Sequence, residues 1–150
     1  MLEPGDKAPD FKLLGDDGEE HSLADWKGQE LILYFYPKDN TPGCTQEACD
    51  FRDAAPKLKK RGAQVVGVSP DSIESHGRFK KKQGLDFLLL SDPEHEVAAK
   101  YGAWGDKVLY GRKFKGIIRS TFVIGKDGKI RAAEYKVSVK GHVDAIVASL

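Results

Sequence analysis

The chain has 150 residues, which suits one folded domain with a substantial apolar core. Its 24 lysines and arginines are nearly matched by 23 aspartates and glutamates, which argues against a protein built around nucleic acid or an anionic membrane. No apolar run approaches the roughly 18 residues that a membrane-spanning helix needs. Residues 1–10 also lack the basic and apolar regions of a signal peptide, so we expect a cytoplasmic protein.

The first third of the chain predicts a hairpin, a buried strand and a long helix. The segments Phe11–Leu14 and Glu20–Leu23 flank a Gly-Asp-Asp-Gly turn, which is typical of a hairpin. The short apolar run Leu31–Tyr36 predicts a central strand. After a turn, Pro42 is suited to the first position of a helix, and Gly62 is suited to the position that follows its last turn.

The rest of the chain alternates between strands and helices and ends in a second hairpin and a helix. The expected elements are strands at Gln64–Ser69 and Phe87–Leu90, helices from Pro70 to Gln83 and from Ser91 to Tyr101, a hairpin of Ser120–Ile124 with Lys129–Tyr135, and a helix at Val139–Leu150. This order predicts an α/β fold whose mixed sheet is covered on both faces. We interpret the basic stretch Lys107–Lys115 as a mobile, solvated loop, because the overall charge is balanced.

Cys44 has the most informative surroundings in the sequence. It lies in the first turn of the helix that begins at Pro42, with Thr41 as the expected N-cap. A thiol there faces unpaired backbone N–H groups and the positive end of the helix dipole. Both favour the thiolate, which is the nucleophilic form of cysteine.

The only other cysteine is Cys49. Two cysteines are too few for a disulfide scaffold, and their spacing without a nearby histidine pair is poor for structural zinc. The remaining interpretations are inert packing and redox chemistry. The residue spacing supports both for Cys44, because it begins an apolar helical stripe that continues through Ala48, Phe51, Ala55 and Leu58.

Helical geometry separates the Cα atoms of Cys44 and Cys49 by roughly 8.6 Å, beyond the ~7 Å limit for a disulfide. A bond between them therefore requires part of the helix to unwind. Pro56 lies inside the same helical pattern and removes the N–H that would bond the Arg52 carbonyl, so we expect a kink or an interruption there. We expect this proline to confine unwinding to the segment around Cys44–Asp53.

The run Pro37-x3-Thr41-x2-Cys44 resembles the active-site motif of the peroxiredoxins, and the longer stretch Tyr36–Asp53 resembles the bacterioferritin-comigratory, or Q-type, subfamily. The likeness continues through Gly5–Phe11, Gly67–Ser69, Asp71–Ser72, His76, Leu90–Asp92, Tyr101–Gly102, Trp104 and Arg119–Phe122. It therefore covers nearly the whole chain. The resemblance implies a thioredoxin-like fold with an N-terminal hairpin extension.

The resemblance also implies thiol-dependent reduction of hydrogen peroxide and organic hydroperoxides. Cys44 corresponds to the peroxidatic cysteine and Cys49 to the resolving cysteine. Thr41 corresponds to the hydroxyl that faces the thiolate and the peroxide, Arg119 to the cation that holds both, and Pro37 to a residue that shields the site. Taken without the family, these three residues are also compatible with an N-cap, a solvated charge and a strand terminator.

The implied cycle forms a sulfenic acid on Cys44, then a disulfide with Cys49, which thioredoxin or a similar dithiol reduces. It needs no metal, flavin, haem or other cofactor. We expect a monomer, because an intramolecular cysteine pair requires no second subunit. The alternative is a non-catalytic redox sensor or holdase that is switched by the same disulfide. A thiol–disulfide oxidoreductase is disfavoured, because the sequence has no C-x-x-C motif.

Overall fold

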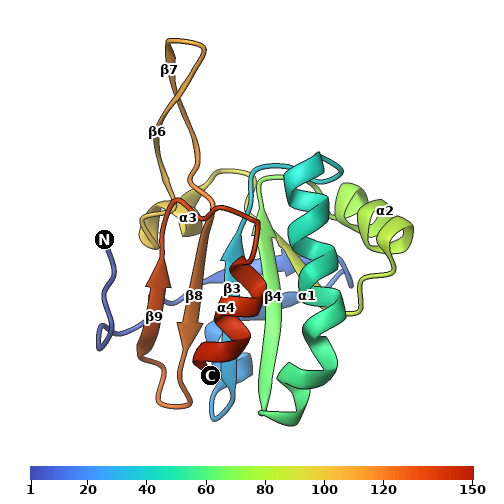
Figure 1. The fold of residues 1–150 in the computed structure, drawn as a ribbon, viewed down its shortest axis with the longest axis vertical. Coiled ribbons are helices and arrows are strands. Elements are labelled where there is room, and N and C mark those ends of the chain that lie inside the picture. The colour runs from blue at the N-terminus through green and yellow to red at the C-terminus, as the bar shows by residue number, and fades with distance from the viewer.

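The computed structural model describes residues 1–150 and is built around a seven-stranded mixed sheet (Figure 1). In spatial order its strands are β2 (Glu20–Ser22), β1 (Lys12–Gly15), β5 (Leu88–Ser91), β4 (Ala63–Ser69), β3 (Glu30–Phe35), β8 (Ser120–Ile124) and β9 (Ile130–Glu134). The three central strands β3, β4 and β5 are parallel, and the outer strands pair antiparallel. The predicted N-terminal hairpin and the hairpin of β8 and β9 are both present.

Both faces of the sheet are covered, as the alternation of strands and helices predicts. The helices are α1 (Pro42–Lys60), α2 (Ile73–Gln83), α3 (Glu96–Lys100) and α4 (His142–Ser149), and a 3-10 turn, η1, spans Leu23–Trp26. Alternate residues of β3 serve two separate apolar clusters, because successive side chains of a strand point to opposite faces. Leu31 and Leu33 join the cluster that contains α3 and Trp26, whereas Ile32 and Tyr34 join the one beneath α1, α2 and α4.

Helix α1 begins at Pro42, as predicted, and its apolar stripe packs on the sheet through Cys44, Ala48, Phe51 and Leu58. It ends at Lys60, and Gly62 follows with a φ of +72°, a backbone conformation that suits glycine. The expected interruption at Pro56 is wrong, because the helix continues through that residue.

Helix α3 is shorter than predicted and begins at Glu96 instead of near Pro93. The cause is His95, whose backbone is left-handed with a φ of 57° and therefore cannot belong to the helix. Asp92 still serves the helix start from a distance, because its carboxylate accepts the N–H groups of Val97 and Ala98.

The interpretation of Lys107–Lys115 as a loop is wrong. This stretch belongs to a separate two-stranded hairpin of β6 (Trp104–Leu109) and β7 (Arg112–Ile117), which extends away from the body (Figure 1). Its two turn residues, Tyr110 and Gly111, have φ values of 52° and 75°. Positive φ at both positions is what a two-residue hairpin turn of type I′ requires. The Tyr-Gly pair was a weaker turn signal than the usual Asn-Gly.

Candidate active site

Cys44 lies at the N-terminus of α1, where the chain has just left the central strand β3. Its side chain is 1% exposed, so the sulfur is enclosed by protein. The first hydrogen bond of the helix runs from the Thr45 N–H to the Thr41 carbonyl at 2.8 Å. The N–H groups of Gly43 and Cys44 precede that bond and have no backbone acceptor, so they remain available at the sulfur end of the helix.

Arg119 connects this helix end to the opposite side of the site. It lies between β7 and β8, and its Nη2 donates to Cys44 Sγ at 3.2 Å. Its Nη1 donates to Glu47 Oε1 at 2.6 Å. Because Glu47 follows Cys44 by almost one helical turn, a single guanidinium holds two neighbouring side chains of α1. The structure thus brings Cys44 and Arg119 together, although they are far apart in the sequence.

Glu47 is a site residue that the sequence reasoning did not identify. Its side chain is fully buried, and burial raises the pKa of its carboxyl to about 7 although the charge of Arg119 acts in the opposite direction. Its second oxygen, Oε2, has no hydrogen-bond partner, and neither has the hydroxyl of buried Tyr34. The only sequence signal was a glutamate on the apolar face of α1, beside Cys44 and Ala48.

Thr41 and Pro37 lie in the loop between β3 and α1, which the sequence predicted to border the site. Thr41 has the extended backbone of an N-cap, but its side chain does not cap the helix. Its hydroxyl instead donates to the Lys38 carbonyl at 2.8 Å, which leaves the oxygen lone pairs free to accept. Pro37 is half-buried at the start of the loop.

The same loop is held down by Asp39, a second residue that the sequence reasoning did not identify. Asp39 is buried, its carboxylate oxygens accept from the hydroxyls of Tyr36 and Ser75 at 2.6 and 2.8 Å, and its Oδ2 lies 2.7 Å from His76 Nδ1. Its backbone N–H donates to the carboxylate of Asp71 at 2.6 Å. These bonds tie the loop that precedes Cys44 to α2 and to the end of β4.

His76, on α2, belongs to the same network. Its Nε2 lies 2.9 Å from the Leu90 carbonyl, which can only accept, so that nitrogen carries a proton. Its Nδ1 faces Asp39 at 2.7 Å. Asp39, Asp71 and His76 lie close enough together to ligate one cation, but their hydrogen bonds already satisfy these groups within the protein. The cluster therefore serves as a structural clamp.

Cys49 faces the end of α2. Its Sγ lies 3.6 Å from Gln83 Oε1, and both cysteines are free thiols within one continuous helix. The neighbouring Arg52 donates to the Gln83 carbonyl at 2.6 Å. This arrangement agrees with the helical geometry, which excludes a static bridge between the two cysteines.

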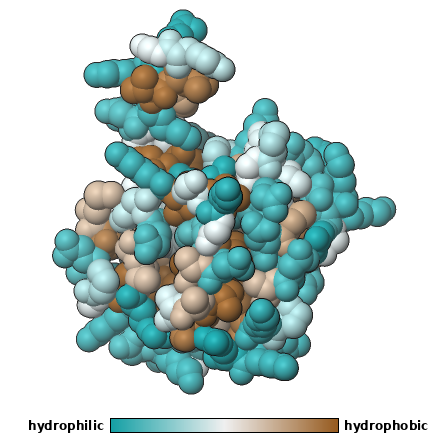
Figure 2. Space-filling model, in the orientation of Figure 1, coloured by the Kyte–Doolittle hydropathy of each residue, from teal (hydrophilic) through white to brown (hydrophobic).

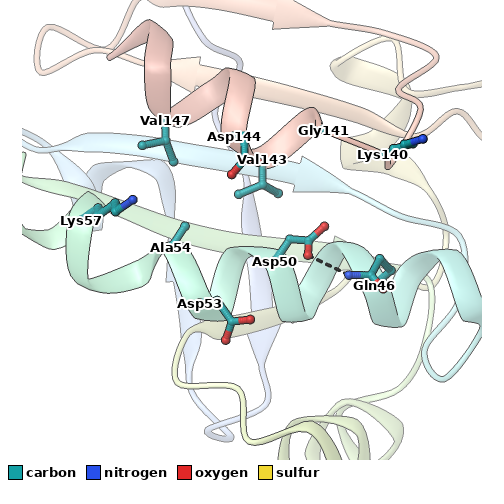
Figure 3. A pocket seen from close by; sticks show the side chains of 10 residues that line it. All are labelled: Gln46, Asp50, Asp53, Ala54, Lys57, Lys140, Gly141, Val143, Asp144 and Val147. Carbon is teal, nitrogen blue, oxygen red and sulfur yellow. Dashed lines mark hydrogen bonds between the residues drawn. The ribbon is translucent and has the colours of Figure 1, made fainter.

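The groove between α1 and α4 is separate from this site (Figure 3). Its walls include Asp50, Asp53 and Lys57 from α1 and Val143 from α4, and Gln46 donates to Asp50 at 2.8 Å. Neither Cys44 nor Arg119 lines it, so the groove is not part of the candidate active site.

Comparison with known proteins gives a consistent result. A model of the AhpC/TSA family matches residues 4–133. Peroxiredoxin Bcp of Bacillus subtilis is 52% identical over 142 residues, which cover 95% of this chain and 90% of that protein. Peroxiredoxin Bcp of Escherichia coli is 44% identical over 146 residues, which cover 97% and 94%. A mutant of Xanthomonas campestris peroxiredoxin Q has a TM-score of 0.91 at 40% identity, covering 99% of this chain and 95% of that chain.

These relatives confirm both the thioredoxin-like peroxiredoxin fold and the resemblance read from the sequence. The matches run through the cysteine-bearing helix, the Arg119 segment and nearly all of the sheet. The chain belongs to the AhpC/TSA family and, within it, to the Bcp/PrxQ peroxiredoxins, which are thiol peroxidases.

Proposed function

We propose that Cys44 is the residue that attacks the hydroperoxide and that Arg119 holds the Cys44 sulfur in position for the reaction. The 3.2 Å contact between Arg119 Nη2 and Cys44 Sγ carries this proposal. A guanidinium keeps its charge at every relevant pH and offers several N–H donors in a fixed plane, so it stabilises a thiolate and can also reach a bound oxygen.

The reaction is an in-line displacement on the O–O bond. The Cys44 thiolate bonds to the outer oxygen of the hydroperoxide, the O–O bond breaks, and the inner oxygen leaves with the electron pair and takes up a proton as water or an alcohol. Cys44 becomes a sulfenic acid. Negative charge grows on the leaving oxygen, and donors already in place stabilise it most where the charge develops. Arg119 and the free N–H groups at the start of α1 are the available donors.

Thr41 and Pro37 are proposed to shape the peroxide-binding side of the site. The Thr41 hydroxyl hydrogen is already donated to the Lys38 carbonyl, so its oxygen is free to accept the O–H of a hydroperoxide. That contact would fix the direction of the peroxide relative to the sulfur. Pro37, at the start of the same loop, would limit the access of water.

Cys49 is proposed to resolve the sulfenic acid. Its thiol condenses with oxidised Cys44 to form a disulfide and release one water molecule. An external dithiol then donates two electrons and two protons through thiol–disulfide exchange, and we propose thioredoxin for this role. Since both cysteines lie in one intact helix, the first turns of α1 must unwind before the bond can form.

We propose that the protein acts on hydrogen peroxide and alkyl hydroperoxides as a cytoplasmic monomer of one domain. A related structure, the bacterioferritin comigratory protein of Xanthomonas campestris, was studied for alkyl peroxide reduction, which supports the substrate class. The intramolecular cysteine pair removes the need for a partner subunit. Family membership sets aside the non-catalytic sensor that the sequence left as an alternative.

The test is peroxide consumption by purified variants with dithiothreitol and, separately, with thioredoxin and its reductase. Cys44→Ser is expected to abolish turnover in both assays. Cys49→Ser is expected to complete one turnover and then stall with thioredoxin. Intact mass after one equivalent of peroxide should show the loss of two hydrogens in the wild type and the gain of oxygen in Cys49→Ser. Full turnover by Cys44→Ser would refute the assignment.

A further inference from the structure

The β6–β7 hairpin carries most of the exposed apolar surface of the molecule. Six large apolar side chains are exposed, and four of them belong to this hairpin, with Val108 64%, Leu109 57%, Tyr110 95% and Phe114 44% exposed. The hairpin extends from the body, and its tip shows apolar atoms between hydrophilic ones (Figure 2). A lone two-stranded ribbon is only marginally stable by itself, and an exposed apolar patch commonly marks an interaction site. This surface therefore indicates a binding partner.

The charge of the chain is distributed unevenly around this arm. Residues 106–115 contain four lysines and arginines and one aspartate, whereas the other 140 residues contain 20 cations and 22 carboxylates. The overall balance therefore hides a cationic arm on a slightly acidic body. The near-neutral net charge of the whole chain argued against an anionic partner, but that argument does not hold for the hairpin alone.

The pairing of the two strands distributes these groups over both faces of the tip. Val108 lies opposite Lys113, and Leu109 lies opposite Arg112. Because opposite residues share a face, each face of the tip has one apolar residue beside one cation. Tyr110 continues from them at the turn. Long basic side chains can extend back toward water while the apolar tip enters a less polar medium.

We propose that this hairpin seats the protein on an anionic lipid surface, with its apolar tip entering the interface between headgroups and acyl chains. A bilayer offers both of the required chemistries, since anionic headgroups attract the cations and the interface accepts the apolar residues. A second copy of this chain fits poorly, because hairpin-to-hairpin contact would bring two cationic arms together, and the exposed large apolar side chains outside the hairpin are only Met1 and Leu14.

The hairpin also connects directly to the candidate active site. Its strand β7 ends at Ile117, two residues before Arg119, and Lys107 donates to the Ile117 carbonyl at 2.8 Å. Strands β3 and β8 pair with Phe35 opposite Ser120, so the hairpin leaves the same end of the sheet as the loop to Cys44 (Figure 1). Seating the tip would turn this end toward the lipid. Membrane-borne lipid hydroperoxides would then be substrates of the enzyme. This part of the inference rests on the proposed peroxidase function.

The binding test uses the reduced full-length protein without peroxide, in flotation with two kinds of vesicle. One contains phosphatidylcholine alone, and the other contains two parts phosphatidylcholine to one part phosphatidylglycerol. Binding is expected to the second kind only and is expected to weaken as salt is added. Absence of binding to the anionic vesicles at low salt would overturn the proposal.

Two double variants separate the charge from the apolar tip. Arg112→Glu with Lys113→Glu is expected to reduce partition onto anionic vesicles by roughly 30-fold or more, because each basic residue near such a surface contributes about fivefold. Leu109→Thr with Tyr110→Asn keeps strand and turn preferences and should weaken binding at high salt most. If either variant bound the anionic vesicles as well as the wild type does, the proposal that the hairpin binds the lipid surface would be refuted.

The matched control reverses the charge of two exposed lysines at the other end of the sheet. Lys27 precedes β3 and Lys126 follows β8, and these two strand ends are neighbours. Lys27→Glu with Lys126→Glu makes the same change in net charge and is expected to retain at least half of the vesicle binding. A loss equal to that of the hairpin charge variant would overturn the proposal, since it would indicate an effect of total charge.

An activity assay compares tert-butyl hydroperoxide in solution with phospholipid hydroperoxide in the anionic vesicles, both with dithiothreitol as the reductant. The hairpin variants are expected to keep wild-type rates on the soluble peroxide and to lose rate only on the vesicles. Unchanged rates on the vesicle substrate would refute the lipid-facing role. If the hairpin variants bind vesicles normally but lose turnover with thioredoxin, the arm binds a protein and the lipid proposal is wrong.

Discussion

Arg119 is the residue on which the geometry of the site depends most. It contacts a sulfur and a carboxylate that are both buried, and those two groups lie on one face of α1. A lysine at this position would keep the charge but lose the planar pair of donors that reaches both partners at once. Glu47 therefore acts through Arg119 and positions it beside Cys44.

The raised pKa of Glu47 makes a prediction about stability. Burial raises the pKa from 4.5 to about 7, so between these pH values the folded protein holds a proton that the unfolded chain has released. The free energy of unfolding should consequently fall as the pH rises across this range and receive no further change from Glu47 above it. Glu47→Gln removes the titration while keeping the shape and one acceptor oxygen.

Urea unfolding at about pH 5 and about pH 8 would measure this effect, and the decrease should be larger in the wild type than in Glu47→Gln by on the order of 2 kcal/mol. Glu94→Gln is the matched control, because Glu94 is exposed and makes no hydrogen bond or ion pair. The same decrease in Glu47→Gln and the wild type would mean that Glu47 ionises normally in the folded protein.

At this scale the sequence identified Cys44, Cys49, Thr41, Arg119 and Pro37 as candidates, but it did not identify Glu47 or Asp39. The first set has local signals in a motif and a helix start. Glu47 and Asp39 gain their importance from contacts with residues far along the chain, at Arg119 and His76. A single sequence read locally has no signal for such pairs.

Helix α1 carries both cysteines, and its intact form keeps them apart. Pro56 has no N–H to give to the Arg52 carbonyl, so the hydrogen-bond ladder of the helix is already incomplete at that point. Beyond Pro56, Leu58 anchors the last turn in the apolar core. The helix therefore has a well-anchored end and an end that must open for the proposed disulfide.

Hydrogen exchange on the peroxide-oxidised protein would test this division of α1. We expect residues 44–53 to lose protection and residues 57–60 to keep it, because the gap in the ladder at Pro56 limits how far unwinding spreads. Cys49→Ser treated in the same way is the control and should keep its α1 protection, since no disulfide can form. Equal loss on both sides of Pro56 would contradict the expectation.

The whole molecule consists of one sheet with an apolar cluster on each face. Both clusters include residues of the central strands β3 and β4, so neither face can unfold without disturbing strands that also support the other. The shared strands support the proposal of a single domain. No helix is both long and apolar enough to cross a bilayer.

We predict one cooperative unfolding transition in urea for the reduced protein. Trp26 lies in the cluster that contains α3, and Trp104 packs against the same cluster, so tryptophan fluorescence reports on that face. The far-ultraviolet circular dichroism comes mostly from α1, α2 and α4 on the other face. The two transitions should have the same midpoint within error. Separate midpoints would show that the two faces unfold independently and would refute the single-domain proposal.

The sequence by itself determined the order of the central elements, the start of α1 and the family. Apolar runs, caps and turn glycines act over a few residues, so these elements can be recognised without knowing what they pack against. Tertiary structure decided the rest. It brought Arg119 to Cys44 and buried Glu47 and Asp39, because these contacts join residues between 36 and 75 positions apart. It also formed the hairpin of β6 and β7, whose strand pairing could not be recognised in a sequence segment rich in charged residues.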